Sequence, residues 1–254
     1  MRNLLTAERR NQLAEQLLSK GSLNVKELSK FYQVSTETIR KDLIYLEKEG
    51  IAKRSYGGAI PAVRPVTEKP VVEKNERNSS SKNEIALEAL KLIPKNSSII
   101  LDGGTTNFAL AQLLKKESGY TIFTNSVPSL SILSESNNNV FALGGMVRSS
   151  SLAIVGDWAN QQLLSIQVDV AFIGTDGFKG FSGPTTIVYD ETAIKKNILQ
   201  VAKKSIVLAD ESKFEETSCF QFANWDDIDT LITNQSAPAE ALEEIRHETE
   251  VILI

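Results

Sequence analysis

Polar residues that could bind an anion or a hydroxyl group follow five short apolar runs in the C-terminal two-thirds of the chain. These polar segments are Asp102-Gly103-Gly104-Thr105-Thr106, Thr124-Asn125-Ser126, Gly144-Gly145, Thr175-Asp176-Gly177 and Asp210-Glu211-Ser212-Lys213. In open α/β sheets, ligands bind at the edge where the carboxyl ends of parallel strands meet. We therefore expect the five loops to converge on one pocket for a small polar ligand.

The first of these loops suits a phosphate group. Gly103 and Gly104 let the backbone turn tightly and approach a ligand, and a helix beginning at Thr105 or Thr106 would point its amides at an anion. Lys213 could add positive charge. An ordinary strand-to-helix turn and a solvated lysine explain the same residues equally well.

The other loops suit sugar hydroxyls. Asn125 and Ser126 offer donors and acceptors, and they could also cap the helix that follows them. Asp176 could bind hydroxyls or close a turn with Gly177.

The pattern around these loops predicts the element that positions them. From Lys82 onward, helical patterns alternate with the apolar runs SIILD, TIFTN, NVFALGG, DVAFIGTDG, SIVLAD, TLITN and VILI. This alternation predicts an α/β domain over residues 82–254, with a mainly parallel sheet covered by helices.

A second, smaller unit is predicted over residues 1–60. Asn24 can cap a helix through Phe31, and Ser35 can cap a second helix through about Glu49, after an earlier helix near residues 6–18. We expect Phe31 to join Ile39 and the other regularly spaced apolar residues in a small core. Residues 51–54 resemble a strand, and residues 56–58 would form the turn of a wing. The layout predicts a winged helix-turn-helix that presents its second long helix to DNA.

The charge distribution agrees with DNA contact by the smaller unit. Residues 1–60 contain 11 basic and 7 acidic residues, a net charge of +4, whereas the remaining residues contain 17 basic and 25 acidic, a net charge of −8. A segregated positive unit fits phosphate neutralisation, which makes affinity fall with salt. The candidate DNA-contacting residues are Ser35, Thr36, Thr38, Arg40, Lys41, Lys53, Arg54 and Tyr56.

Residues 61–81 have the composition of a linker. The segment contains three prolines, many charges and a serine run. We expect it to be extended and to let the two domains move relative to one another.

The composition of the chain limits the classes of protein to which it can belong. The chain has 254 residues, 41% of them hydrophobic and 24% charged, which suits about two domains with sizeable cores. Its one cysteine excludes an intrachain disulfide, and Cys219 and the lone His247 have no metal-ligand spacing between them. With no signal peptide and no apolar run of about 18 residues, we expect a cytoplasmic protein with no membrane, metal or cofactor partner.

The motifs resemble those of a known family. The segment VSTETIRKDLIYLEKEGIAKRSYGGA (34–59) resembles the winged helix-turn-helix of the DeoR family of bacterial sugar-metabolism regulators, with Tyr56 where many members carry histidine. The segments LDGGTTNFALAQLL, TNS, LGGMVR, VDVAFIGTDGF and VLADESKF are similar to the family's sensor domain, which resembles ribose-5-phosphate isomerase and the CoA-transferase fold. By position, the resemblance implies ligand contacts from Asp102, Gly104, Thr105, Thr106, Asn125, Ser126, Gly145, Asp176, Gly177, Glu191, Lys195 and Lys213.

These observations predict a DNA-binding transcriptional regulator of a carbohydrate operon, more often a repressor in this family. A phosphorylated sugar would be the effector, and a homodimer or homotetramer would bind operator DNA. The alternative is an isomerase-like enzyme fused to a DNA-binding head, with Glu191, Asp176 or Asp210 as the base. Phe178 and Lys179 follow Asp176-Gly177 where the isomerases carry further acidic residues, so we expect no catalytic residues.

Overall fold

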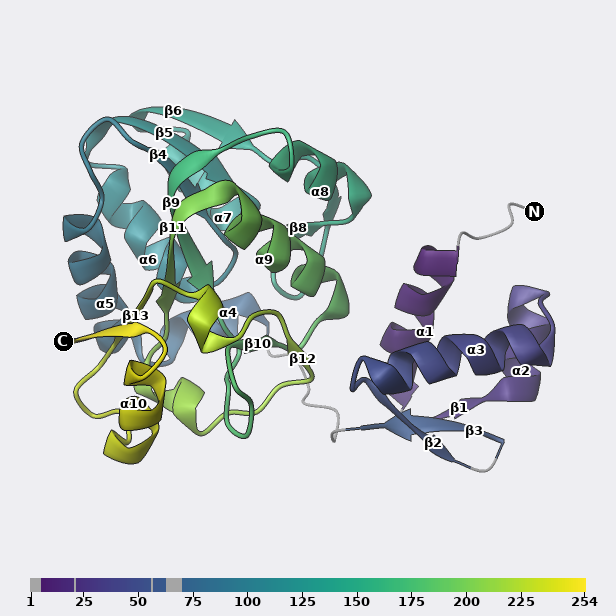
Figure 1. Cartoon of the computed structure of the whole chain (residues 1–254). Helices are drawn as coiled ribbons and strands as arrows, with labels where there is room; N and C mark the ends of the chain where they lie inside the picture. The colour runs from purple at the N-terminus through teal and green to yellow at the C-terminus, as the bar shows by residue number, and fades with distance from the viewer. Residues whose placement is uncertain (1–5, 21, 56, 63–69) are drawn as a thin grey trace.

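The computed structural model describes residues 6–20, 22–55, 57–62 and 70–254. Its N-terminal unit contains helices α1 (Thr6–Lys20), α2 (Val25–Tyr32) and α3 (Thr36–Lys48). A small antiparallel sheet of β1 (Leu23–Asn24), β2 (Ala52–Ser55) and β3 (Gly58–Pro61), in the order β1-β3-β2, completes it. The predicted helix-turn-helix and wing are both present (Figure 1).

The helix starts in this unit follow from their caps. The side chain of Asn24 accepts a hydrogen bond from the amide of Lys26 at 2.9 Å, and the hydroxyl of Ser35 accepts one from the amide of Thr38 at 3.0 Å. Each cap satisfies a backbone donor that has no partner within its own helix. Between the two helices, Gln33 takes the left-handed conformation, with a φ of 54°. The two predicted caps are confirmed.

A small apolar core and one buried ion cluster hold the unit together. Leu13 and Leu17 of α1 pack with Ile39 of α3 and its neighbours. Asp42, buried on α3, accepts hydrogen bonds from Arg9 at 2.6 Å and Arg10 at 3.0 Å. The prediction that Phe31 joins this core is wrong, because 69% of Phe31 is exposed and its ring packs edge-on against Tyr32.

The C-terminal domain is built on a seven-stranded, entirely parallel sheet. Every predicted apolar run contributes a strand, and the strands are β4 (Ser98–Leu101), β5 (Ser118–Thr124), β6 (Asn137–Ala142), β9 (Val168–Gly174), β11 (Ala202–Leu208), β13 (Thr230–Thr233) and β14 (Glu250–Leu253). Their order is β14-β13-β11-β9-β4-β5-β6, and each neighbouring pair is parallel. The chain runs outward from β4 to β6 and then returns to place β9 beside β4. The topology therefore reverses between β4 and β9, where ligands of such sheets bind.

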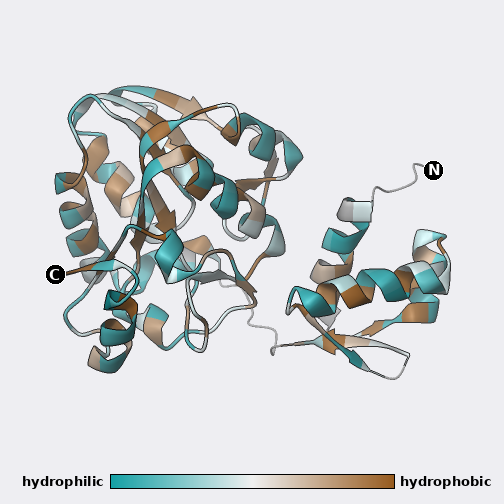
Figure 2. Ribbon diagram, viewed as in Figure 1, coloured by the Kyte–Doolittle hydropathy of each residue, from teal (hydrophilic) through white to brown (hydrophobic). Residues whose placement is uncertain are grey.

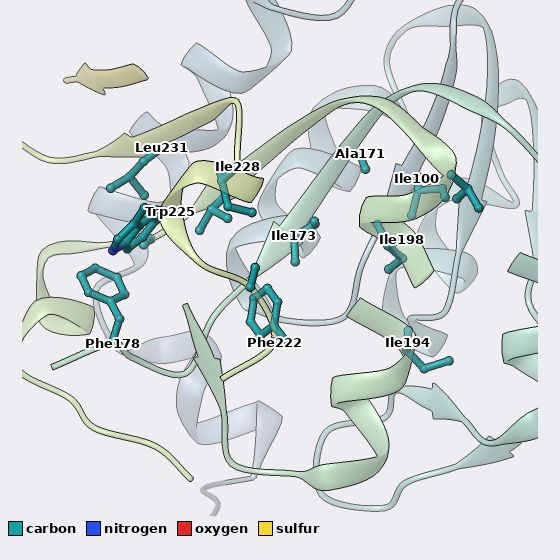
Figure 3. Packing of buried hydrophobic residues seen from close by; sticks show 14 of the residues in the cluster. Ile100, Ala171, Ile173, Phe178, Ile194, Ile198, Phe222, Trp225, Ile228 and Leu231 are labelled. Carbon is teal, nitrogen blue, oxygen red and sulfur yellow. The ribbon is translucent and has the colours of Figure 1, made fainter. Parts of the chain in front are cut away.

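Helices cover both faces of this sheet. One face packs against α5 (Ser79–Lys91), α6 (Thr105–Leu114) and α7 (Val127–Leu133), and the other against α8 (Asp157–Leu163), α9 (Tyr189–Val201) and α10 (Ala239–Arg246). Figure 2 shows brown, apolar strands between helices whose outer faces are teal. In the second layer, Phe178 packs edge-on against Trp225 with ring centroids 5.0 Å apart (Figure 3).

Short elements extend the strand-end loops. These are β7 (Met146–Val147), β8 (Ile154–Val155), β10 (Thr185–Thr186), β12 (Phe220–Gln221) and the 3₁₀ turns η1 (Glu211–Phe214) and η2 (Trp225–Asp227). Strand β10 pairs with β12, and β7 pairs with β8.

The segment before the sheet differs from its prediction. A short helix α4 (Val71–Glu76) and the first turns of α5 lie within residues 61–81, which were expected to be an extended linker. The prediction is wrong for residues 71–76 and 79–81. Between and within these two helical stretches, Lys74, Arg77 and Asn78 bind groups at the sheet edge rather than solvent alone.

The N-terminal unit touches the C-terminal domain through a small apolar contact. Cys219 and Phe220 belong to the same buried cluster as the helix-turn-helix core, and Tyr189, the first residue of α9, packs against that cluster. Burial raises the pKa of Tyr189 to about 12, and the neighbouring Tyr45 of α3 adds to this rise. The start of α9 therefore lies against the N-terminal unit.

Candidate nucleic-acid interface and ligand pocket

The exposed side of α3 carries the predicted basic residues. Arg40 and Lys41 are exposed, and Thr36 and Thr38 are half-buried beside them. The guanidinium of Arg40 lies 3.4 Å from a carboxylate oxygen of Glu37, and both side chains are more than half exposed. Such a pair contributes little to stability and can be exchanged for a phosphate contact.

The predicted residues of the wing are also exposed, but one of them has a structural role. Lys53 and Arg54 lie on β2. The guanidinium of Arg54 donates to Glu47 of α3 at 2.6 Å, and the amide of Arg54 donates to the same carboxylate at 3.2 Å. These bonds hold the pKa of Glu47 below its ordinary value and join the wing to α3. Tyr56 lies outside the described residues.

The side chain of Ser35 caps the start of α3. Its hydroxyl accepts from the amide of Thr38 and lies 2.8 Å from the hydroxyl of the same residue. The pair sets where α3 begins and which of its side chains face outward.

A cavity of about 340 Å³ lies at the carboxyl edge of the sheet, beside the reversal point between β4 and β9. Seven of the predicted ligand residues line it: Gly104, Thr105, Thr106, Asp176, Glu191, Lys195 and Lys213. Three of the five predicted loops, at residues 102–106, 175–177 and 210–213, therefore meet at one cavity as predicted. The prediction is wrong for the loops at 124–126 and 144–145, which do not line it. The volume suits a small ligand.

The start of α6 forms one wall of the cavity. Gly104 has a φ of 115°, which favours glycine, and it occupies the N-cap position without a side chain to cap the helix. Thr105 and Thr106 follow it and are buried. The first amides of α6 therefore point toward the cavity, an arrangement suited to an anion.

A buried ion pair joins the cavity to the residues behind this wall. The ammonium group of Lys195 contacts a carboxylate oxygen of Asp102, and both side chains are at most 5% exposed. Asp102 also accepts from the amide of Gly174 at 3.2 Å, which joins the ends of β4 and β9. Burial alone would lower the pKa of Lys195, but the carboxylates of Asp102 and Glu191 outweigh it and raise the pKa. Lys195 is therefore a fixed cation.

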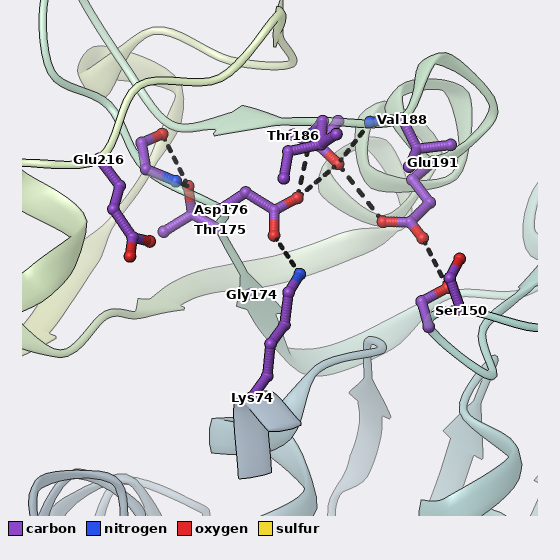
Figure 4. A network of polar contacts seen from close by, with 12 residues as sticks. Lys74, Ser150, Gly174, Thr175, Asp176, Thr186, Val188, Glu191 and Glu216 are labelled. Atoms are coloured by element: carbon purple, nitrogen blue, oxygen red, sulfur yellow. Dashed lines mark hydrogen bonds and ion pairs between the residues drawn. The ribbon is translucent and has the colours of Figure 1, made fainter. Parts of the chain in front are cut away.

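A second polar network lies on the opposite wall (Figure 4). One oxygen of Asp176 accepts from Lys74 of α4 at 2.8 Å, and the other accepts from the Thr186 hydroxyl at 3.1 Å. Glu191 accepts from Ser151 at 3.0 Å and pairs with Arg148 at 3.6 Å. Burial would raise the pKa of Asp176, but the charge and hydrogen bond of Lys74 hold it well below its ordinary value. Asp176 is therefore an ionised acceptor.

The third wall comes from the end of β11. The side-chain amide of Asn78 donates a hydrogen bond to the carboxylate of Asp210 at 2.8 Å. The ammonium group of Lys213 pairs with the carboxylate of Glu216 at 2.5 Å. Burial would raise the pKa of Asp210, but hydrogen bonds from Ser212 and Asn78 hold it below its ordinary value.

Two family models match this chain. The DeoR-like helix-turn-helix domain matches residues 9–62, and the DeoR C terminal sensor domain matches residues 77–235. The chain belongs to the DeoR family. It is accordingly a DNA-binding transcriptional regulator, as the resemblance implied.

Relatives match along nearly the whole length of this DeoR-family chain. A protein named as a putative aga operon transcriptional repressor of Escherichia coli O157:H7 is 37% identical, over 98% of this chain and 94% of its own. The lactose phosphotransferase system repressor of Lactococcus lactis subsp. lactis is 32% identical, over 96% of this chain and 97% of its own. Among solved structures, ribose 5-phosphate isomerase A of Methanocaldococcus jannaschii aligns with a TM-score of 0.39 and 22% identity over 54% of each chain.

Five of the predicted ligand residues do not line the cavity of this DeoR-family chain. Asp102 and Asn125 lie behind it, where the Asn125 amide donates to Asp102 at 3.3 Å. Ser126 caps α7 by accepting from the amide of Ser129 at 3.3 Å. Gly145 and Gly177 are closely packed, since an added Cβ would lie 2.6 Å from the Val155 oxygen and 2.2 Å from the Glu216 oxygen.

The sequence reasoning missed the contribution of α4 and α5. Six residues line the cavity from this segment: Val71, Glu73, Lys74, Arg77, Asn78 and Lys82. The sequence feature that could have indicated them is the high density of charge in the segment before the first strand of the sheet. That segment was interpreted as a solvated linker.

Among the residues that the structure describes, no group of three or more histidine, cysteine, aspartate or glutamate side chains could hold a metal ion. No helix in the described part of the chain combines the length and the apolar character needed to cross a membrane.

Proposed function

We propose that this chain represses a carbohydrate-use operon in the cytoplasm and that a phosphorylated sugar in the C-terminal cavity lowers its affinity for operator DNA. The observation that carries the proposal is the composition of the cavity. Backbone amides of α6 and the ammonium group of Lys213 suit a phosphate, while Asp176 and Glu191 suit hydroxyls. Two relatives named as repressors of sugar operons support the carbohydrate class.

DNA contact in this proposal comes from α3 and the wing. Arg40 and Lys41 would face the major groove together with Thr36 and Thr38, and Lys53 would face the backbone. A two-fold oligomer would place two α3 helices on half-sites about 34 Å apart, or a multiple of that distance. The effector would favour an arrangement in which this spacing is lost, at a coupling free energy of about 1 to 3 kcal/mol.

The hydrogen bonds and ion pairs made by the carboxylates of Asp176 and Asp210 favour a binding role over a catalytic one. A base that moves a proton at neutral pH needs a pKa near the operating pH. The pKa values of Asp176 and Asp210 are instead held below their ordinary range. We expect no interconversion of aldose and ketose phosphates, and a steady rise in product at high protein concentration, proportional to the protein added, would revive the isomerase alternative.

The direct test is a panel of hexose, pentose, triose and amino-sugar phosphates. Each compound is screened by thermal shift and then by its effect on operator binding in a fluorescence anisotropy assay. We expect one class to raise the melting temperature and weaken DNA binding, while its unphosphorylated sugar does neither. The proposal fails if no phosphorylated sugar changes either quantity, or if the unphosphorylated sugars act equally well.

A further inference from the structure

Lys82 is a buried cation in the wall of the cavity. It lies in the first turn of α5 and is 6% exposed. Its ammonium group donates to the backbone oxygens of Lys74 and Arg77, each at 2.5 Å. Within the described ranges, no carboxylate oxygen lies within the 4.0 Å that defines an ion pair with this ammonium. Burial of a charge without a counter-ion is costly.

The groups around Lys82 leave this corner of the cavity positive. Burial lowers the pKa of Lys82, the carboxylate of Asp210 opposes that effect, and the charges of Lys213 and Arg77 add to it. Glu216 pairs with both of these cations, at 2.8 Å with Arg77 and 2.5 Å with Lys213. Three cations therefore face two carboxylates.

The start of α6 faces the same space. Helices α5 and α6 pack side by side, both lead away from the carboxyl edge of the sheet, and Lys82 and Thr105 line one cavity. Positive charge and backbone donors thus meet at one end of the cavity.

We propose that Lys82 binds the phosphate group of the effector, between the amides at the start of α6 and the ammonium group of Lys213. This inference deepens the proposed function and rests on it for the sugar part of the ligand. The phosphate supplies the counter-ion that Lys82 lacks. The class of ligand is a phosphate monoester, and inorganic phosphate shares its anionic chemistry.

The position of Lys82 also connects the phosphate to the DNA-binding unit. Its two backbone acceptors belong to α4 and to the residue that follows α4. Helix α4 has only six residues and is held mainly by the polar contacts of Lys74 and its neighbours. When the ammonium of Lys82 turns to a phosphate, α4 loses donors at its C-terminal end. The segment that tethers the N-terminal unit then loosens.

The test uses three variants of the full chain. Lys82→Met removes the charge with similar length, Lys82→Arg keeps it, and Lys91→Met removes an exposed cation at the far end of the same helix. Circular dichroism first establishes that each variant is folded. Melting temperatures are then measured against the sugar-phosphate panel and against inorganic phosphate, with chloride added to match ionic strength.

We expect Lys82→Met to weaken binding of the active sugar phosphate and of inorganic phosphate roughly 10- to 100-fold, the loss of one charge-assisted contact. Lys82→Arg should retain most of the binding, and Lys91→Met should match the parent chain. A folded Lys82→Met that binds both probes as the parent does overturns the inference, because a residue that only caps α4 would change stability and leave both titrations alone.

The two proposals fail in different ways. If a sugar phosphate weakens operator binding and Lys82→Met responds equally, only the assignment of Lys82 is wrong. If no sugar phosphate acts but inorganic phosphate stabilises the chain through Lys82, the anion site stands and the proposed effector is wrong. If neither probe stabilises the parent chain, both are wrong.

Discussion

Basic side chains of α3 and β2 in the N-terminal unit lie on the surface, whereas one group in the C-terminal domain, which includes Lys82, Lys195 and Lys213, lines a cavity beside carboxylates. Arg40 is 60% exposed, while Lys195 is 5% exposed and paired with Asp102. An exposed cation can exchange water and counterions for a DNA phosphate at little cost, and salt competes with it. A buried cation is already positioned, and a ligand must fit among its existing partners. The first arrangement suits a long polyanion, and the second suits discrimination among small ligands.

The largest expected effect comes from breaking the buried pair. Asp102→Ala leaves the Lys195 ammonium without its carboxylate in the interior and should lower the free energy of unfolding by about 3 to 5 kcal/mol. Lys203→Ala, which breaks an exposed pair with Asp169, should cost less than about 1 kcal/mol. Urea denaturation compares the two variants. Equal losses would contradict the contrast between buried and exposed charge.

A smaller effect should follow from removing a cation of the cavity. Lys213→Ala removes a half-buried ammonium group and should raise the effector concentration needed for DNA release roughly 10-fold or more, since one charge-assisted contact is lost. Lys179→Ala removes a nearby exposed lysine and serves as the matched control. Release by both variants at the parent's effector concentration would show that the cavity is misassigned.

The exposed cations of α3 should determine how strongly operator affinity depends on salt concentration. Arg40→Ala and Lys41→Ala should each weaken operator binding and reduce the slope of log affinity against log salt concentration by about 0.9 if the lost contact is to a phosphate. Lys116→Ala, an exposed lysine of the C-terminal domain, should change neither. The assignment of α3 is wrong if operator affinity is the same in both α3 variants as in the parent.

The smallest expected effect is a change in folding stability at acidic pH. The pKa of Asp176 is lower in the folded chain than its unfolded value of about 3.9, so its ionised form stabilises the fold above about pH 4 and this contribution is lost as pH falls below that value. Asp176→Asn should therefore be less stable than the parent at pH 7, with the difference narrowing toward pH 3. Thermal unfolding across this range measures it, and a difference that stays constant with pH would exclude the linkage.

Local patterns were enough to predict most of the fold. The seven apolar runs became seven parallel strands. Inner strands such as β4 and β9 are nearly continuous in apolar residues because helices cover both of their faces. The caps at Asn24 and Ser35 could be predicted because they depend on a few adjacent residues. Phe31 has the spacing of a core residue and is nevertheless exposed, since periodicity alone cannot show where the packed surface ends.

The cavity was harder to predict in detail. Loops at strand ends could be assigned to one edge, but which side chains face the cavity depends on three-dimensional packing. Asn125 and Asp102 lie one layer behind it for this reason. The proposed role of Lys82 could not be predicted, because its partners are backbone oxygens of Lys74 and Arg77 and two of its charged neighbours, Asp210 and Lys213, are far away in the sequence.

The contact between the two domains provides a natural reporter. Cys219, the one cysteine of the chain, lies 8% exposed within the cluster that joins β12 to the helix-turn-helix core. Separation of the two domains would open this thiol to solvent. The rate at which a maleimide alkylates the unmodified protein would therefore follow domain release in real time, without any engineered label.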